Sequence, residues 1–552
     1  ILPSDVNELP RFRQNVILHH QYNKHSTKQK GRENTYVETD GDMCIIHIGD
    51  STEGWVDALK AYLLCLVDQD APNHIMLDYT EIRVKGATLS KFGGTASGYE
   101  SIMDMFTKIH EVIQHGKYSS LPVNGKLRPI HCLDICNLIG QNVVVGGVRR
   151  TAEIAIIDPQ DEECVHAKDN IQPGMEHRYM SNNSIFQEEK PSREEIHELF
   201  ESIRISGEPG IINVAEAKRR RADFAGSNPC NEILLPPNAV CNLTTVNMVA
   251  FVDKQGNVDW DGLEQAFILS ARAGYRMTCV DLELEGWNVA HHRDRLTGCS
   301  MTGWQDFIAK MSNNTFVRAG GKAGILKWLR NVIHEAGEDI ASELKTPVPL
   351  LMTALKPEGS LSLVANGVSP GIHWQHSPYF IRRIRVNAHD PLALTAKELG
   401  WQIHPEVGQD METATTLVID FPVHSPSEVT KADIPAVEQL KEYILFQKFY
   451  TDMNTSNTIT VKPDEWEEVE DFVYNHWDDM LGVTFLELNS TYYPLMPYEE
   501  CTKEEYEELK SKMKPFDPDL LNAMELSTRN MGKEFEILDD RAECSQGVCP
   551  IR

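Results

Sequence analysis

The chain has 552 residues, of which 41% are hydrophobic, so it is long enough for a large buried core and for more than one domain. Its net charge of -29 excludes a general DNA- or RNA-binding protein, because the nucleic-acid phosphates would be repelled. No apolar run approaches the roughly twenty residues of a membrane helix, and the start at Ile1 lacks the pattern of a signal peptide. Twelve cysteines without such a signal indicate reduced thiols in the cytoplasm.

Helical and strand patterns alternate along most of the chain. Residues 1–45 are polar and are predicted to be irregular. Helices are predicted at 50–67, 99–114, 135–145 and 192–206, and short strands at 75–79 and 154–157. The alternation continues to about residue 465 and predicts an α/β fold with strands inside and helices outside. The charged segment 498–535 is predicted to be helical and solvated.

The chain ends in a pair of cysteines, Cys544 and Cys549. The segment after Asp540 has no core-forming pattern and is expected to be mobile. A structural disulfide there would tie down nothing, and a zinc site would need further ligands. We therefore interpret the tail as a dithiol that reduces a disulfide elsewhere by exchange, with a chance pairing of two cysteines as the alternative.

A second cysteine motif is the segment Asn228–Glu232, which Cys241 follows. If this segment is extended, alternate side chains share a face, so Asn228, Cys230 and Glu232 are expected to point the same way. The proline within the motif favours a loop or a strand tip over a central strand. The simpler alternative is a buried cysteine beside a capping asparagine.

These groups suit the removal of a ribose 2′-hydroxyl, which leaves poorly from an unactivated carbon. A thiyl radical on a cysteine can take the 3′-hydrogen. A carboxylate can accept the 3′-hydroxyl proton, and an amide can hold the hydroxyls in place. Two further thiols can supply the electrons and become a disulfide.

The sequence resembles the adenosylcobalamin-dependent (class II) ribonucleoside-triphosphate reductases of the monomeric type. Any one matching segment is weak, but their order and spacing are specific. The resemblance implies a ten-stranded α/β barrel of two antiparallel-related halves, with the radical cysteine on an inner finger loop and the N-terminal part of the barrel missing. The matching segments are Asp50–Trp55, Phe92–Gly98, Asp134–Gly140, Val148–Glu153, Ser181–Ser184, Gly207–Asn213, Asn228–Glu232, Cys241–Leu243, Met301–Asp306, Lys356–Ser360, Tyr379–Arg385 and the tail Cys544–Ile551.

The resemblance also implies a role for each residue of the two cysteine motifs. Cys230 matches the thiyl-radical cysteine, Glu232 the general base and Asn228 the amide that binds the hydroxyls. Cys241 matches one half of the redox pair that reduces the substrate. The tail dithiol matches the pair that re-reduces it and that thioredoxin reduces in turn.

Three nucleotide or cofactor regions follow from the same resemblance. A ribonucleoside triphosphate is expected at Ser181 and at a phosphate loop formed by Lys356, Pro357, Glu358, Gly359 and Ser360. Adenosylcobalamin, the radical source, is expected near 368–385, where its contacts would be His373, Tyr379, Arg382 and Arg385. A deoxynucleoside triphosphate effector is expected in the region from Leu9 to Arg150.

The expected domains are 1–150 for the effector region and early barrel, 151–497 for the catalytic barrel with its finger loop at 226–243, 498–540 for a helical C-terminal region and 541–552 for the redox tail. Two features depart from the family. The partner thiol of Cys241 would lie upstream of Ile1, so the sequence is interpreted as a fragment, a processed product or one half of a split protein. A separate N-terminal chain is a candidate partner, and the chain is expected to be inactive alone unless such a chain supplies the rest. Glu358 stands where relatives carry a small hydroxyl residue, and a carboxylate beside a triphosphate is unfavourable.

Two alternative functions remain open from the sequence. The first is the large subunit of a class I reductase, which needs a tyrosine pair, but the segment around Tyr492 and Tyr493 does not match that radical relay. The second is a non-catalytic nucleotide-binding fragment. His131, Cys132 and Cys136 are predicted to be core positions and not metal ligands.

Overall fold

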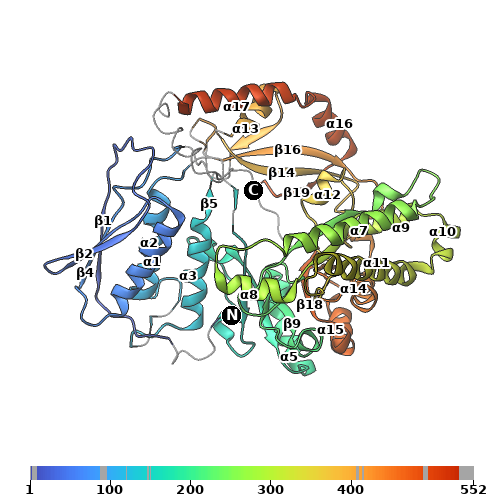
Figure 1. The fold of residues 1–552 in the computed structure, drawn as a ribbon, viewed down its shortest axis with the longest axis horizontal. Helices are drawn as coiled ribbons and strands as arrows, with labels where there is room; N and C mark the ends of the chain where they lie inside the picture. Colours follow the sequence, from blue (N-terminus) through green and yellow to red (C-terminus); the bar gives the residue numbers. More distant parts are fainter. Residues whose placement is uncertain are drawn as a thin grey trace.

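The computed structural model describes residues 2, 9–87, 96–119, 121–122, 124–145, 148–149, 151–388, 390–405, 410–412, 414, 416–488 and 495–533. The structure has an N-terminal sheet with its helices, a central body of strands and helices, and a C-terminal sheet (Figure 1). The strands of the C-terminal sheet lie within residues 379–500, and residues 436–487 between them return to the body. Within these residues, no helix is both long enough and apolar enough to cross a membrane.

The N-terminal region is a four-stranded sheet in the order β1-β4-β3-β2, and its helices pack on the face that turns toward the body (Figure 1). Its core is formed by residues between Phe12 and Leu138. The prediction that residues 1–45 are irregular is wrong, because strands occupy part of this segment. β1 and β2 contain no buried residue, so burial imposes no apolar pattern on them, and β3 begins only at the end of the segment. The elements are β1 (Ile17–Gln21), β2 (Tyr36–Asp40), β3 (Met43–His47), β4 (His74–Asp78), α1 (Thr52–Val67), α2 (Glu100–His115) and α3 (Pro129–Asn142).

The predicted helix at 50–67 is confirmed as α1, which begins where the sequence signal places it. Ser51 is the N-cap, and its Oγ accepts a hydrogen bond from the backbone N–H of Gly54 at 2.8 Å. The predicted strands at 75–79 and 154–157 and the predicted helices at 99–114 and 192–206 are also found, within one or two residues.

The central body contains a five-stranded sheet in the order β17-β18-β9-β8-β7. Parallel pairs join β7 to β8 and β8 to β9, β9 runs antiparallel to β18, and β18 is again parallel to β17. Two sets of parallel strands therefore meet at one antiparallel junction. The strands are β7 (Glu153–Ile157), β8 (Ser181–Gln187), β9 (Gly210–Asn213), β17 (Thr458–Val461) and β18 (Gly482–Glu487).

Isolated bridges continue this order beyond β17. Thr455 pairs in parallel with Leu355, and Thr353 pairs in parallel with Cys299 of β13 (Gly298–Thr302). β13 is parallel to β12 (Leu243–Asn247). The predicted α/β architecture is thus confirmed, and the parallel sets have the opposed directions that two antiparallel-related half-barrels require.

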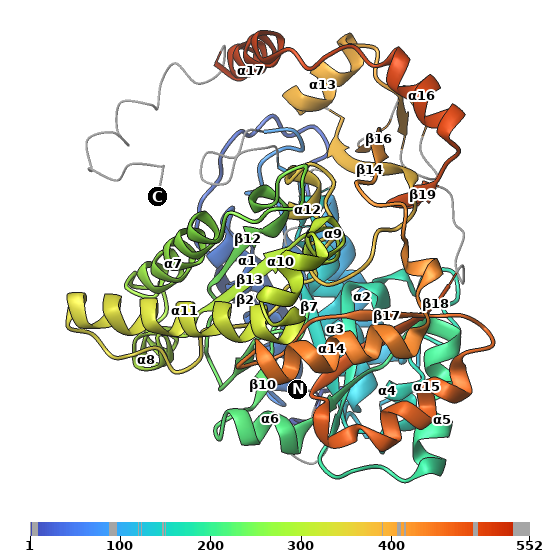
Figure 2. The same cartoon turned by 90° about the vertical axis from the view of Figure 1, so that its right-hand side faces the viewer.

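Helices cover the outside of these strands (Figure 2). One core lies among α7, α11 and α14 and contains Phe267, Leu329 and Phe446. Another lies among α5, α14, α15 and β18 and contains Phe200, Trp466 and Phe485. The helices of the body are α4 (Glu162–Val165), α5 (Arg193–Ser206), α6 (Val214–Arg220), α7 (Trp260–Met277), α8 (Glu285–Asp294), α9 (Trp304–Lys310), α10 (Asn313–Arg318), α11 (Gly321–Leu344), α12 (Leu361–Val364), α14 (Ala436–Phe449) and α15 (Trp466–Asn475).

The C-terminal sheet has the order β15-β16-β14-β19 and is antiparallel throughout. It lies above the body together with α13, α16 and α17 (Figure 1). The prediction of a helix from residue 498 is wrong at its start, because residues 498–500 pair with β14, and it is confirmed in α16 and α17. The elements are β14 (Tyr379–Asn387), β15 (Ile403–Pro405), β16 (Thr416–His424), β19 (Tyr498–Glu500), α13 (Pro391–Glu398), α16 (Lys503–Lys512) and α17 (Pro518–Lys533).

Candidate active site

The cysteine motif at Asn228–Glu232 forms the tip of a short hairpin. Two-residue strands, β10 (Gly226–Ser227) and β11 (Leu234–Leu235), pair antiparallel and leave the motif as the connecting turn. The turn is closed by the N–H of Asn231, which donates to the carbonyl of Asn228 at 2.8 Å, and Asn231 has a left-handed φ of 59°. The expectation of a strand tip or loop is therefore confirmed.

The expectation that three side chains of the motif share one face is wrong. Asn228 is 8% exposed and Glu232 is 2% exposed, whereas Cys230 is exposed at the tip of the turn. The alternation rule assumes an extended backbone, and the left-handed Asn231 ends that extension. The turn nevertheless brings the amide and the carboxylate together beside the thiol-bearing tip.

A side-chain hydrogen bond joins Asn228 to Glu232. The Oδ1 of Asn228 accepts from the backbone N–H of Ile233 at 2.9 Å, so its amide NH₂ is the group that faces the carboxylate. Burial raises the pKa of Glu232, and the charge of Glu358 raises it further, while Asn228 and Lys356 oppose the shift. Glu232 is thus a carboxyl group that holds a proton more readily than an exposed glutamate.

Two asparagines outside the motif hold the turn in place, and the sequence reasoning missed both. The Nδ2 of Asn454 donates to the carbonyl of Asn231 at 2.7 Å, and its backbone N–H donates to the carbonyl of Glu232 at 3.1 Å. The Nδ2 of Asn182 on β8 donates to the carbonyl of Pro229 at 2.8 Å. Both halves of the barrel therefore bind the turn that carries Cys230.

Cys241 lies half-buried just before β12 and packs against the cluster that contains Ile233 and Leu234. Burial raises the pKa of its thiol, and the charge of Glu232 raises it further, so the two side chains are electrostatic neighbours. The structure thus places this predicted redox cysteine beside the predicted base. Cys544 and Cys549 lie outside the described residues.

The predicted phosphate loop, Lys356–Ser360, lies next to the hairpin turn. Leu355 donates its N–H to the carbonyl of Asn454 at 3.1 Å, and Asn454 in turn contacts Glu232. The N–H of Lys356 donates to the Oγ of Ser300 on β13 at 3.0 Å. These contacts connect the loop to the backbone of Glu232 and to β13.

The orientation of the Glu358 side chain explains how a carboxylate fits in a phosphate loop. Its side chain is 3% exposed, and its Oε1 accepts a hydrogen bond from the Oγ1 of Thr245 at 2.5 Å. The next two residues, Gly359 and Ser360, are exposed. The carboxylate is therefore turned inward, away from the solvent-facing part of the loop where phosphates would lie.

Ser181 is buried at the first position of β8. Its Oγ donates to Asn183 at 2.9 Å, and its carbonyl accepts from the Nζ of Lys168 at 2.5 Å. The neighbouring Asn182 contacts the hairpin turn, so Ser181 lies at the edge of the site.

The predicted cofactor residues do not share one face of β14. Tyr379 and Arg385 lie on the face opposite to Arg382, because side chains alternate along a strand. Tyr379 stacks on His424 at 4.6 Å, and Arg385 donates to the carbonyl of Leu495 at 3.2 Å. His373, which precedes the strand, accepts from the N–H of Thr458 at 3.1 Å through Nε2, so its Nδ1 donates to the carbonyl of Pro370 at 2.9 Å.

Arg382 faces the phosphate loop. Its guanidinium lies 4.6 Å from the ring centroid of Tyr498, whose hydroxyl donates to the carbonyl of Gly359 at 2.9 Å. Its Nε is buried without a hydrogen-bond partner among the described residues. Next to the loop, Val364 of α12 is 83% exposed. The Nη1 of Arg382 donates to the carbonyls of Arg383 and Pro497 at 2.9 Å. Tyr498 is a contact that the sequence reasoning missed.

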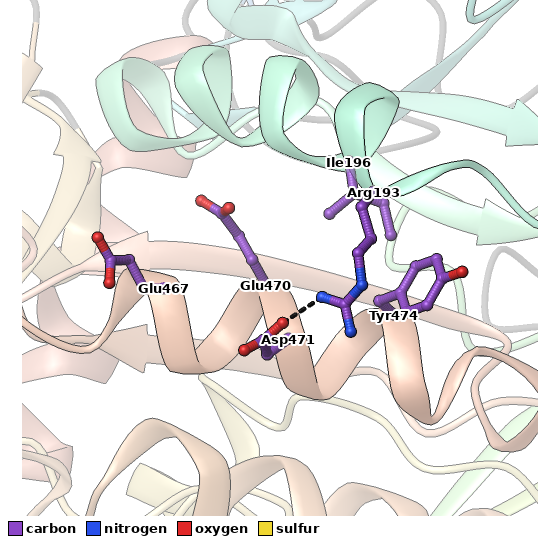
Figure 3. A pocket seen from close by; sticks show the side chains of 6 residues that line it. All are labelled: Arg193, Ile196, Glu467, Glu470, Asp471 and Tyr474. Carbon is purple, nitrogen blue, oxygen red and sulfur yellow. Dashed lines mark hydrogen bonds and ion pairs between the residues drawn. The ribbon is translucent and has the colours of Figure 1, made fainter.

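Two other features lie away from this site. The Nδ1 of His131 accepts from the N–H of Arg128 at 2.9 Å and so caps α3. A pocket of about 220 Å³ lies between α5 and α15 and is lined by Arg193, Ile196, Glu467, Glu470, Asp471 and Tyr474 (Figure 3). An ion pair between Arg193 and Asp471 crosses it, and none of the predicted site residues lines it.

Comparisons with known proteins agree with this geometry. Residues 16–113 match the family model of the B12-dependent ribonucleotide reductase insertion domain, and residues 144–314 match that of the ribonucleotide reductase barrel domain. A solved structure titled as a B-12 dependent (class II) ribonucleotide reductase is similar with a TM-score of 0.73 at 24% identity, covering 94% of this chain and 76% of that chain.

Curated relatives match over almost the whole chain. An adenosylcobalamin-dependent ribonucleoside-triphosphate reductase of Levilactobacillus brevis is 28% identical, over 93% of this chain and 70% of the relative. One of Lactobacillus gasseri is 27% identical, over 100% of this chain and 78% of the relative. These matches support class II over the class I alternative. Over almost its whole length, the chain is similar to the adenosylcobalamin-dependent (class II) ribonucleotide reductases.

Proposed function

We propose that this chain reduces ribonucleoside triphosphates to 2′-deoxyribonucleoside triphosphates for DNA synthesis by a thiyl-radical mechanism. One observation carries the proposal: the hairpin turn presents Cys230 at its tip next to the buried pair of Asn228 and Glu232. A radical-forming thiol, a base and an amide are the groups that the reaction needs. The names of the curated relatives support the triphosphate as substrate.

The reaction assigns one step to each group. Adenosylcobalamin, when bound, supplies the radical that converts the Cys230 thiol to a thiyl. Cys230 then takes the 3′-hydrogen, and Glu232 accepts the 3′-hydroxyl proton while Asn228 holds the hydroxyls. The 2′-hydroxyl leaves as water. Cys241 and a second thiol become a disulfide and give up two electrons and two protons, of which one proton leaves with the hydroxide as water and one is added at C2′. Cys230 then returns its hydrogen to C3′ and is a thiyl again, and Glu232 returns its proton to the 3′-oxygen.

The cofactor is proposed to lie on the side of β14 that carries Arg382, next to Tyr498 and the exposed Val364. The guanidinium would donate to amide oxygens at the rim of the corrin. His373 would only support the wall of that space, since both of its ring nitrogens already bind backbone groups. Tyr379 and Arg385 would support the cofactor site from the opposite face of β14.

Several partners belong to the same proposal. The tail dithiol, Cys544 and Cys549, would reduce the disulfide of Cys241 by exchange and would be reduced by thioredoxin. A separate N-terminal polypeptide is proposed as the source of the second thiol of the Cys241 pair. Cys44 and Cys65 are not proposed for this role, since they contact each other in the N-terminal sheet region at 3.0 Å. A deoxynucleoside triphosphate effector would bind in the region 9–150.

The test is a Cys230→Ser variant. The protein is supplied with the N-terminal part, adenosylcobalamin, a ribonucleoside triphosphate and a small dithiol, and deoxynucleotide is quantified by chromatography. Cys230→Ser is expected to abolish product, whereas Cys279→Ser, which changes another exposed cysteine, is expected to retain it. Product formation by Cys230→Ser would refute the assignment, and no product from the unmodified protein would refute the proposed function.

The tail makes a separate test possible. A variant with both Cys544 and Cys549 changed to Ser is expected to lose turnover with thioredoxin as reductant. It is expected to keep turnover with a small dithiol that reaches the Cys241 disulfide directly. Equal loss with both reductants would contradict the shuttle role.

A further inference from the structure

Two buried carboxylate oxygens in the site lack a hydrogen-bond partner among the described residues: Oε2 of Glu232 and Oε2 of Glu358. The two side chains are only 2% and 3% exposed. A buried carboxylate oxygen without a donor is unfavourable, and such atoms in a folded protein mark strain or an absent ligand. Two such oxygen atoms in one site therefore indicate a ligand with two hydrogen-bond donors.

The two glutamates belong to the same site. Glu232 is joined through Asn454 to Leu355 by backbone hydrogen bonds, and Leu355 begins the segment that carries Glu358. The charge of Glu358 acts on Glu232, and Lys356 acts on Glu232 and on Cys241. The Nζ of Lys356 lies 3.8 Å from the Oε2 of Glu358, which balances part of the charge but is too long for a hydrogen bond.

Glu358 is held in this position and does not reach it by chance. Its φ is 56°, a left-handed conformation that a glutamate rarely adopts. The Oγ1 of Thr245 on β12 occupies Oε1 at 2.5 Å, so Oε2 is the atom that remains for a ligand. Thr245 pairs with Ser300, whose Oγ accepts from the N–H of Lys356, so both ends of the turn are fixed to neighbouring strands.

We propose that Glu358 is a second ribose-binding carboxylate, whose Oε2 accepts a hydrogen bond from the 2′-hydroxyl of the substrate while Glu232 accepts one from the 3′-hydroxyl. The inference rests on the proposed function and assigns a role to the carboxylate of the phosphate loop. The vicinal hydroxyls of a ribose are two neighbouring donors, and the site holds two buried carboxylate oxygens that lack a donor among the described residues. The 2′-deoxy product lacks one of them and leaves Glu358 unpaired, so the site distinguishes substrate from product.

The experiment compares how tightly the wild-type protein and its variants bind a ribonucleotide and its deoxy analogues. A ribonucleoside triphosphate and its 2′-deoxy and 3′-deoxy analogues are titrated by calorimetry without cofactor or reductant, so that no turnover occurs. A saturating deoxynucleoside triphosphate with a different base fills any effector site. The wild-type protein is expected to bind the ribonucleotide about tenfold or more tightly than the 2′-deoxy analogue, as for a hydrogen bond to a charged group.

The decisive variant is Glu358→Asn, because asparagine tolerates the left-handed backbone and its shorter side chain withdraws from the ligand. It is expected to bring the ribonucleotide and the 2′-deoxy analogue to within about twofold of each other, while the penalty for the 3′-deoxy analogue remains. Thr245→Val, which releases Glu358 without altering it, is expected to reduce the 2′ preference in part. Glu398→Ala, which removes an exposed carboxylate at the end of α13, is expected to change neither affinity.

The outcomes separate this inference from the proposed function. A Glu358→Asn variant that keeps the full 2′ preference, or weakens both ligands equally, would overturn the role of Glu358 alone. A wild-type protein that binds no ribonucleotide would overturn the proposed function and this inference with it.

Discussion

At the scale of single residues, the two buried glutamates predict a pH dependence. As a base Glu232 must be ionised, and burial raises its pKa above the usual value of about 4.3 for glutamate, so kcat/KM is expected to fall as the pH drops through that raised pKa. Removing the negative charge of Glu358 lowers the pKa of Glu232. The acid limb of Glu358→Asn is therefore expected to shift to lower pH.

The measurement is kcat/KM against pH for the two proteins. Glu398→Ala serves as a control whose acid limb should not move, because its carboxylate is exposed on α13. An acid limb that moves to higher pH in Glu358→Asn would contradict the electrostatic coupling between the two glutamates.

The sequence predicted which residues come together better than it predicted how they are arranged. Asn228, Glu232 and Cys241 are brought together as expected, but the common face for Cys230 failed because a single left-handed residue, Asn231, turns the chain. The inward direction of Glu358 depends on Thr245, which is 113 residues away in sequence. No local pattern contains a contact of that kind, and so the sequence showed only that Glu358 was unusual.

At the scale of elements, Asn454 fastens the hairpin turn to the strand that pairs with Leu355. Its Nδ2 donates to the carbonyls of Asn231 and Gly482, and its Oδ1 accepts from Tyr443 and Gln447, so its side-chain hydrogen bonds are all made within the protein. Asn454→Ala would leave buried partners unpaired. The free energy of unfolding is expected to fall by about 2–3 kcal/mol, and the turn is expected to become more mobile.

The mobility of the turn is measured in two ways. The rate at which iodoacetamide alkylates Cys230 should change in Asn454→Ala, and hydrogen exchange at residues 230–232 should become faster. Asn475→Ala, which changes an exposed asparagine at the end of α15, should leave both unchanged. Unaltered alkylation and exchange in Asn454→Ala would show that the turn holds its shape without this clamp.

Elements were predictable where their own residues determine them. α1 and α5 carry an N-cap serine and an acidic first turn, and both were located to within two residues. β1, β2 and β19 were missed because they are short, contain no buried residue and are stabilised by pairing with other strands. Their formation depends on partners that a reading along the sequence does not see.

At the scale of the whole molecule, the family resemblance implied a barrel of two antiparallel-related halves but not the order of its strands. No pattern along the chain specifies which strands pair across several hundred residues. Separate hydrophobic cores support the proposed domain boundary near residue 150. Phe106 belongs to a core formed only by residues between Phe12 and Leu138, whereas Phe446 belongs to a core of the body. α3 links the two regions, since Leu138 packs in the first core and Leu133 packs with Ile157 of β7.

Independent cores predict separable thermal transitions. Phe106→Ala removes a fully buried ring from the N-terminal core, which costs about 3–5 kcal/mol, and differential scanning calorimetry should show one transition moving to lower temperature while the other stays. Phe446→Ala, an equally buried ring in the body, should move the other transition instead. If both variants lower a single common transition, α3 couples the regions so tightly that residues 9–145 do not unfold as a unit of their own.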